Sequence, residues 1–400
     1  DVRGFQAAYL AGFVGYLALV WVITRSTVAS NPGKWRWWLI GCIAVRAVLL
    51  ATPPGDDAYR YVWEGRVQLA GFNPFLHPPD DPSLAELRDA DWAKINHRDY
   101  PAIYGPVAQA EFLVAAAIHP SVYTIKTLHV VWDLLIIVVL AACLRRGPDP
   151  LVGGRRPHGA VLYGLCPLVL TAFGIEGHLD SLMLLAVAIA VWAVLSKRLH
   201  LAGVMLGLAI ATKIIPIVLL PWFLIRHRRA AVIAVVVTAI CYLPYLSAGM
   251  GVFASLRRFG TADEFFSMLS AFSITSFESD AVRWAVLGLL AVILLALARR
   301  RDNFTMYGLG ATGALLILTP IVHYWYLSWV LMFTPFRVHL RWLVIALAMV
   351  VYFEAQLRRH TTGIWSMPTW APLVVWGGFA AAWLVELVVP WHALIHGRRR

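Results

Sequence analysis

Two adjacent carboxylates, Asp56 and Asp57, stand near the start of the stretch PPGDDAYRYVWEGRVQLAGFNPF, residues 53–75. Arg60, Glu64 and Arg66 follow closely. A carboxylate beside a reacting hydroxyl group acts as a general base, and a guanidinium group binds phosphate through paired hydrogen bonds. The stretch therefore has the residue types for proton transfer and anion binding. The acidic pair is also compatible with a solvated loop, or with the cap of a helix that begins near Ala58.

Three further stretches place polar or aromatic side chains beside apolar runs: ATKIIP with Lys213, EGHLDS with His178 and Asp180, and TPIVHYWYLSW with His323, Tyr324 and Trp325. A lysine inside an apolar run either has a function or extends its ammonium group to the membrane surface. The histidine and aspartate are compatible with a helix end, and the aromatic residues with an interfacial belt. Such a belt needs tryptophan and tyrosine but gives no reason for His323.

The rest of the chain is too apolar for a water-soluble protein. Of its 400 residues, 60% are hydrophobic and 14% are charged. This composition predicts an all-α fold, a polytopic membrane helix bundle. The net charge of +12 comes from basic residues in short loops, which membrane topology explains better than nucleic-acid binding. The four cysteines are scattered in apolar segments and predict neither a disulfide nor a metal site.

Apolar runs of spanning or near-spanning length predict about 12–13 transmembrane helices. The runs begin near Phe5, Trp38, Thr124, Ala160, Asp180, Leu201, Ile214, Ala230, Ala281, Phe304, His323, Leu340 and Ala371. Lys213 and Pro216 interrupt one run, and two short helices are expected to meet there because proline lacks an amide proton. We expect residues 1–400 to form one membrane domain with two long loops, 53–106 and 248–280.

Basic residues orient the chain, because cytoplasmic loops carry an excess of lysine and arginine. The basic loops contain Arg25/Lys34/Arg36, Arg145/Arg146/Arg155/Arg156, Lys197/Arg198, Arg226/Arg228/Arg229, Arg299–Arg301, Arg337/Arg341 and Arg398–Arg400, and Arg358/Arg359 is the exception. The two long loops then face away from the cytoplasm, provided that the apolar segment 106–119 is short, partly inserted or re-entrant. The same orientation brings Asp56/Asp57, His178/Asp180, Lys213 and His323/Tyr324 to one membrane surface.

Five stretches together resemble the membrane-embedded GT-C glycosyltransferases: DDAYRYVWEGRVQLAGFNPF, INHRDYPAIYGPVAQ, GHLDSLMLL, ATKIIPIVLLP and VHYWYLSWVL. The likeness is closest to bacterial polyprenyl-phosphate-dependent mannosyltransferases of the glycosyltransferase 87 type, and it extends from about Pro53 to Pro335. It implies an inverting enzyme of the bacterial inner membrane with its active site on the periplasmic face. A single hexose, mannose by resemblance, would move from a polyprenyl-phosphate donor to a lipid-linked or glycan acceptor.

The resemblance also implies roles for individual residues. One loop carboxylate is the catalytic base, which alignment on DDAYRY identifies as Asp56 and counting back from GFNPF identifies as Asp57. The candidates for binding the donor phosphate are Arg60, Arg66 and Lys213. Contacts with the sugar or the acceptor are assigned to Tyr59, Glu64, His97, Tyr104, His178, Asp180, His323, Tyr324 and Trp325. The family often has Tyr-Pro-Pro where this chain has Tyr104-Gly105-Pro106, which leaves the role of that segment open.

No cofactor is expected, because Asp56, Asp57, His178, Asp180 and His323 lack the spacing of a compact metal-ligand motif. Two other classes of membrane protein are compatible with the same features. A ligase or polymerase of lipid-linked oligosaccharides would use the same membrane face but would transfer an oligosaccharide. A secondary transporter or flippase would place its ionisable residues near the bilayer midplane between internal repeats. The sequence leaves open the sugar, the acceptor and the linkage.

Overall fold

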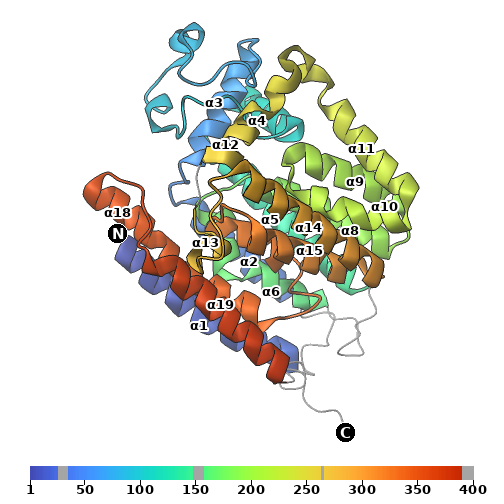
Figure 1. Ribbon diagram of the computed structural model, residues 1–400. Coiled ribbons are helices and arrows are strands. Elements are labelled where there is room, and N and C mark those ends of the chain that lie inside the picture. Colours follow the sequence, from blue (N-terminus) through green and yellow to red (C-terminus); the bar gives the residue numbers. More distant parts are fainter. Residues whose placement is uncertain (26–34, 147–156, 263–264, 390–400) are drawn as a thin grey trace. The chain divides into compact units, whose positions relative to one another are not determined.

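The computed structural model describes residues 1–25, 35–146, 157–262 and 265–389, which fold into helices and connecting loops (Figure 1). This confirms the all-helical membrane architecture. The chain forms two compact units, each assembled from distant segments. Unit 1 contains Asp1–Cys42, Leu140–Leu170 and Asp263–Arg400, and unit 2 contains Ile43–Val139 and Thr171–Ala262. Some residues used for the orientation lie outside the described residues, namely Lys34, Arg155, Arg156, Arg398, Arg399 and Arg400.

Five described helical segments are long and apolar enough to cross a membrane. They are α1 (Val2–Arg25), α5 (Val122–Leu144), α14 (Asp280–Arg300), Leu340–Thr362 and α19 (Trp370–Val388). Two bent pairs raise the number to seven if each is one span: Pro157–Gly164 with Pro167–Ile175, and Arg228–Cys241 with Leu243–Gly260. Five described helices are apolar but shorter: α4 (Pro106–Ile118), α8 (Asp180–Leu195), α9 (Leu199–Thr212), Ile215–Arg226 and α15 (Phe304–Leu318). The expected number of about 12–13 transmembrane helices included near-spanning runs, and it stays a prediction, because length alone does not show which of the shorter helices cross the membrane.

Three local expectations have clear outcomes. The run expected to begin at His323 is not a span, because η8 (Tyr324–Leu327) and α16 (Ser328–Leu331) are single turns. The break at Lys213 is confirmed: α9 ends one residue earlier, Lys213 is extended, and η6 (Ile215–Leu219) begins around Pro216. The shortness of the segment after residue 105 is confirmed too. Helix α4 has 13 residues and is about 20 Å long at the usual rise.

Small residues let the helices of unit 2 approach closely. Helix α9 lies between α8 and α11 (Arg228–Cys241), and it contacts both (Figure 1). A Cβ atom on Gly203 would lie 2.4 Å from the carbonyl oxygen of Ala230, and one on Gly207 would lie 2.6 Å from that of Ala234. Helices in lipid associate through such close backbone packing, because burial of apolar surface gains little there. The two glycines thus fix α9, and with it Lys213 at its end.

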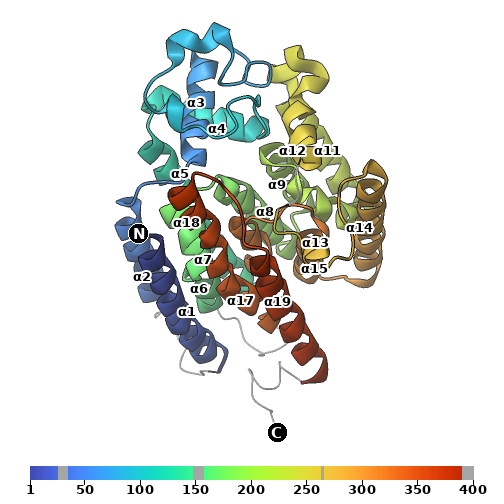
Figure 2. The same ribbon diagram turned by 60° about the vertical axis from the view of Figure 1, so that its left-hand side comes forward.

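The long loop after α2 (Trp35–Leu50) folds around α3 (Asp57–Leu69), which lies beside α4 (Figure 2). One face of α3 stacks Tyr61 on Phe112 of α4, with ring centroids 4.8 Å apart. Another face buries Trp63 against the loop turns η2 (Pro82–Leu87) and η3 (Trp92–Lys94) and their flanking residues. A Cβ atom on Gly65 would lie 2.2 Å from the carbonyl oxygen of Phe112, so only glycine allows this approach. Helix α3 is therefore a rigid base for the side chains at its start.

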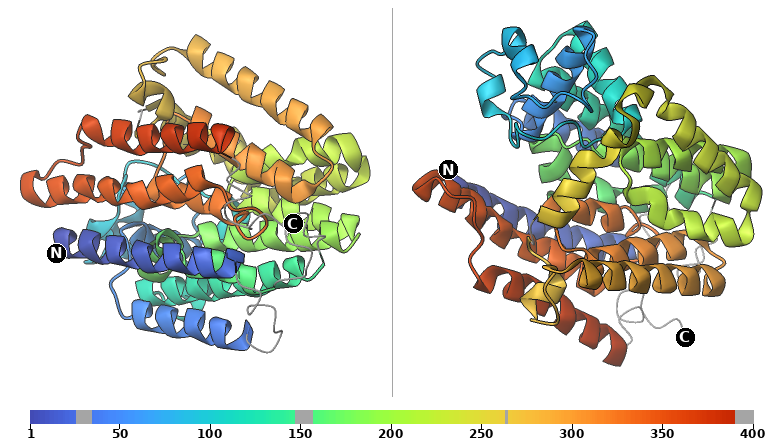
Figure 3. Two further views of the ribbon diagram at one scale, coloured as in Figure 1. Left: turned by 90° about the horizontal axis from the view of Figure 1, so that it is seen from below. Right: turned by 45° about the horizontal axis from the view of Figure 1, so that its top comes forward.

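Unit 1 is built around α1, α14, α15 and two helices that run side by side, α17 (Leu340–Ala348) and α19 (Figure 3). The hydroxyl group of Tyr9 in α1 donates a hydrogen bond to the carbonyl oxygen of Ala346 in α17, at 2.7 Å. An aromatic cluster surrounds η8. In it, His323 stacks on Trp325 with ring centroids 4.4 Å apart, and Nδ1 of His323 hydrogen-bonds with the hydroxyl group of Tyr352 at 2.7 Å.

Candidate active site

Several chain segments of unit 2 meet where its ionisable residues gather. The amide of Gly55, just before α3, donates to the carbonyl oxygen of Glu176, in the turn before α8 (3.0 Å). The amide of Gly105, just before α4, donates to the carbonyl oxygen of Thr212, the last residue of α9 (2.9 Å). A Cβ atom on Gly105 would lie 2.2 Å from the carbonyl oxygen of Ala211. These bonds link the start of α3 to the turn before α8, and the start of α4 to the end of α9.

Asp57 is held by three side chains. Asn96 donates a hydrogen bond to its Oδ1 at 2.8 Å, and the hydroxyl group of Tyr61 lies 3.4 Å from its Oδ2. Nδ1 of His178 lies 3.3 Å from the same Oδ2. Asp56 occupies the position that caps α3, but its side chain makes no capping hydrogen bond. A helix cap therefore does not explain the acidic pair.

His178 lies between two carboxylates. Its Nε2 is 2.9 Å from Oε2 of Glu176, its Nδ1 faces Asp57, and its side chain is only 3% exposed. Burial alone lowers the pKa of the imidazole, but hydrogen bonding and charge attraction to Asp57 and Glu176 outweigh it and raise this pKa to about 9. His178 is therefore an imidazolium ion at neutral pH, and it ties the start of α3 to the turn before α8.

The turn that carries Glu176 and His178 has an unusual backbone. It follows η5 (Leu170–Ile175), a π-helical turn, a form frequent at functional sites. Gly177 has a φ of +71°, and a Cβ atom there would lie 3.1 Å from the side chain of Lys126. Nδ1 of His129 hydrogen-bonds with the carbonyl oxygen of Gly177 at 2.6 Å. Glycine is thus required for both conformation and space, and helix α5 holds the turn in place.

Lys213 forms an ion pair with Asp180, the first residue of α8. Its Nζ lies 3.0 Å and 3.2 Å from the two carboxylate oxygens. The side chain of Asp180 is 1% exposed and that of Lys213 is 16% exposed. A buried carboxylate without a cation would be costly, so this pair fixes the ammonium group beside the turn of His178. The structure thus brings together Asp57, His178, Asp180 and Lys213.

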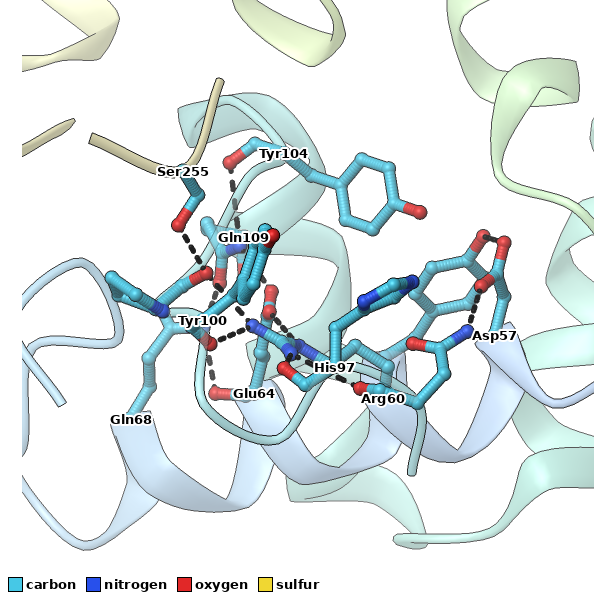
Figure 4. A network of polar contacts seen from close by, with 12 residues as sticks. Asp57, Arg60, Glu64, Gln68, His97, Tyr100, Tyr104, Gln109 and Ser255 are labelled. Carbon is cyan, nitrogen blue, oxygen red and sulfur yellow. Dashed lines mark hydrogen bonds and ion pairs between the residues drawn. The ribbon is translucent and has the colours of Figure 1, made fainter. Parts of the chain in front are cut away.

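Arg60 and Arg66, both assigned to phosphate binding, hold the long loop to α3. Nε of Arg60 donates to Oε1 of Glu64 at 2.6 Å, and its two terminal nitrogens donate to backbone carbonyl oxygens of residues 96, 97, 100 and 101 (Figure 4). Arg66 pairs with the carboxylate of Asp89 and donates to the carbonyl oxygen of Leu87 at 2.8 Å. Neither contact set reaches the Lys213–Asp180 pair.

The other assigned residues differ in accessibility. Glu64 is 2% exposed and forms an ion pair with Arg60. Tyr59 and Tyr104 are half-buried and His97 is exposed, so these three keep a surface open to a ligand. The remaining three, His323, Tyr324 and Trp325, belong to unit 1, in the aromatic cluster around η8.

Asn96, Tyr61 and Glu176 are contact residues that the sequence-based assignments omit. Asn96 and Glu176 stand inside two of the motif stretches, INHRDY and EGHLDS, and this position was a usable signal. Tyr61 stands in the stretch DDAYRY as well, and its contact with Asp57, four residues earlier, follows from the pitch of α3. Among the residues that the structure describes, no group of three or more His, Cys, Asp or Glu side chains is arranged to hold a metal ion.

No curated protein matches the chain. Residues 2–229 match a family model described as alpha-(1->6)-mannopyranosyltransferase, N-terminal domain. The matched region includes Asp56, Asp57, His178, Asp180 and Lys213. Since the match covers more than half of the chain, the protein is a glycosyltransferase and belongs to this mannosyltransferase family, the MptA_B family.

Proposed function

We propose that the protein transfers one mannose from a polyprenyl-phosphate donor to a hydroxyl group of a lipid-linked or glycan acceptor, with inversion at the anomeric carbon. The observation that carries the proposal is the meeting of the acidic loop with His178 and Lys213 at the linked helix ends of unit 2. The family description supports mannose and an alpha-(1->6) product. The acceptor group is then a 6-hydroxyl, and inversion requires a β-linked donor.

We place this reaction on the extracytoplasmic face of the bacterial plasma membrane. Helix α8 runs from Asp180 to Leu195 and α9 returns from Leu199 to the residue before Lys213. Lys197 and Arg198 therefore lie at the end of these helices remote from the site. The excess of basic residues in cytoplasmic loops then supports an outward-facing site. Nucleotide sugars are cytoplasmic, so an outward-facing enzyme needs a sugar carried across on a lipid.

Asp56 is the proposed general base. Its carboxylate takes the proton of the acceptor hydroxyl while that oxygen attacks the anomeric carbon. The new carbon–oxygen bond forms as the bond from this carbon to the phosphate oxygen breaks, and the electron pair leaves with the polyprenyl phosphate. Asp57 is less suited to this role, because a neighbouring imidazolium makes a carboxylate a weaker base and Asn96 already donates to it.

Lys213 is the proposed cation for the departing phosphate. The hydrogen bonds of Arg60 and Arg66 lie within the loop, whereas Lys213 is partly exposed beside the turn of His178. An ammonium group acts on phosphate as a compact point charge, and charge placed in advance stabilises the transition state. We propose further that Tyr59, His97 and Tyr104 contact the sugar or the acceptor, and that the reaction needs no metal ion.

The test uses the protein in lipid nanodiscs with radiolabelled polyprenyl-phosphate mannose and a mannose-containing lipid acceptor. Transfer of label, and an α-linked product by NMR, are the expected results. GDP-mannose should give no product under the same conditions. Transfer from GDP-mannose, a β-linked product, or no transfer from any mannosyl lipid by folded protein would each overturn the proposal.

A further inference from the structure

We propose that Arg60 is a positioning residue: it fixes the loop 96–101 and, through Asn96, the orientation of the carboxylate of Asp57. This inference rests on the proposed function, because its consequence is measured in mannosyl transfer. It replaces the direct phosphate contact expected of Arg60 by a role through the loop that faces the site.

Five acceptor oxygens surround the guanidinium group of Arg60. It donates to Oε1 of Glu64 (2.6 Å) and to the carbonyl oxygens of His97 (2.9 Å), Tyr100 (2.6 Å) and Pro101 (2.8 Å), with a longer contact to that of Asn96 (3.5 Å). Arginine has five N–H donors in a rigid fork. Figure 4 shows this side chain enclosed by the loop, so its donors point at protein atoms.

Buried partners hold Arg60 itself. Oε2 of Glu64 accepts a hydrogen bond from Nε2 of Gln109 in α4, at 2.6 Å. Oε1 of Gln109 accepts from Gln68, whose own Oε1 accepts from the hydroxyl group of Tyr245 (3.0 Å and 2.8 Å). Arg60, Glu64 and Gln109 are 5%, 2% and 0% exposed. A buried polar network gives a single arrangement when its members are satisfied, so the guanidinium fork has a fixed direction.

The loop connects Arg60 to the carboxylate of Asp57. Asn96 and His97 are held by Arg60 through their carbonyl oxygens, while the Asn96 side chain donates to Oδ1 of Asp57 at 2.8 Å. His97 has a φ of +45°, a strained conformation for a residue with a Cβ atom. Such strain persists only where the surroundings enforce it, and the 2.9 Å bond from Arg60 to the His97 carbonyl oxygen is one such restraint.

Helix α12 (Ala254–Ala262) also contacts this loop. The hydroxyl group of Ser255 donates at 2.8 Å to the carbonyl oxygen of Pro101, which also accepts from Arg60. Arg258 pairs with the carboxylate of Asp99, and its guanidinium carbon lies 3.8 Å from the centroid of the Tyr100 ring. Residues 96–101 are therefore restrained by both α3 and α12, as a positioning loop requires.

Arg60→Lys and Asn96→Ala, alone and combined, test this link in nanodiscs. A lysine keeps the positive charge but cannot span the same carbonyl oxygens, so we expect kcat to fall by about 10-fold to 100-fold, the usual cost of small misplacements. The donor KM should stay unchanged. Asn96→Ala should cause a similar fall in kcat. Because both substitutions act through one link, the kcat of the double variant should be about that of the more impaired single variant. Arg98→Lys is the matched control, since Arg98 lies in the same loop but its Nε faces Asp80 at 3.7 Å; it should behave as wild type.

Three results would overturn the inference. The first is wild-type kcat in Arg60→Lys combined with a raised donor KM in Arg60→Gln, which would indicate a charge contact with the donor. The second is independent, multiplicative losses in the double variant. The third is an unchanged kcat in Asn96→Ala, which decides the matter even if the Arg60 variants do not fold. Failure of the proposed function looks different, because wild-type protein itself would then transfer no mannose.

Discussion

Asp57 and His178 form an ion pair, with 3.3 Å between Oδ2 and Nδ1, that joins the start of α3 to the turn before α8. Glu176 lies on the other side of the same imidazole, 2.9 Å from Nε2. One buried cation thus lies between two carboxylates that would otherwise repel each other.

The raised pKa of His178 makes stability depend on pH. Folding raises this pKa from 6.5 to about 9, so the contribution of the protonated imidazole is complete below about pH 6.5 and is lost as the pH rises through about 9. We expect the Tm of wild-type protein in nanodiscs to fall across this range. His178→Gln should have a lower Tm at pH 6.5 and a flatter dependence, and an equally steep dependence in this variant would contradict the assignment.

Asp56→Asn should reduce kcat by about 100-fold or more, because a general base contributes at least this factor. The fold should be retained, since asparagine has nearly the size of aspartate and is equally suited to the position that caps α3. Single-turnover transfer, with a thermal melt for each variant, measures both quantities. Asp91→Asn is the matched control, because Asp91 is an exposed loop carboxylate paired with Lys94, and it should remain fully active.

Asp57→Asn separates the two carboxylates of the pair. It removes one of the two negative partners of His178 and leaves Glu176, so the pH dependence of the Tm should flatten in part, less than in His178→Gln. Transfer should be reduced less than in Asp56→Asn. If Asp57→Asn abolishes transfer and Asp56→Asn leaves it intact, the base is Asp57.

The features that could be predicted from the sequence depend on strong local rules. The helix break at Lys213 follows from proline, and the shortness of α4 follows from the charge of the loops around it. Apolar runs show where a helix is tolerated and not where it ends, so they did not separate the segments of full spanning length from the shorter apolar helices. The run at His323 is the clearest case, since its residues form two single turns.

The partners of Arg60 could not be predicted, although the residue itself was identified. Four of its five acceptors are backbone carbonyl oxygens of residues 96–101. Every residue has a carbonyl oxygen, so the sequence does not show which of them accept these hydrogen bonds. Glu64, by contrast, stands four residues later on the same helix, where a salt bridge is expected. The side chains at the site were thus partly predictable, but the use of each one depends on loop geometry.

Lys213→Met should destabilise the protein by about 3 kcal/mol, because it leaves the buried carboxylate of Asp180 without its cation. Combining it with Asp180→Asn removes the uncompensated charge and should recover most of the Tm. Transfer should remain lost in the double variant, because the phosphate still lacks its cation. A double variant that regains both stability and transfer would restrict Lys213 to a structural role.

Gly105→Ala should lower the Tm, with a cost of about 1–3 kcal/mol for overpacking. Its φ is −72°, which alanine adopts easily, so the cause is steric: the new Cβ would lie 2.2 Å from the carbonyl oxygen of Ala211. The start of α4 and the end of α9 must then move apart. Since Lys213 directly follows α9, its ammonium group shifts and kcat should fall. Gly41→Ala in α2 is the control, since a Cβ there would meet no described atom within 4 Å. Equal melting temperatures for the two variants would show that the close approach of α4 and α9 is not required.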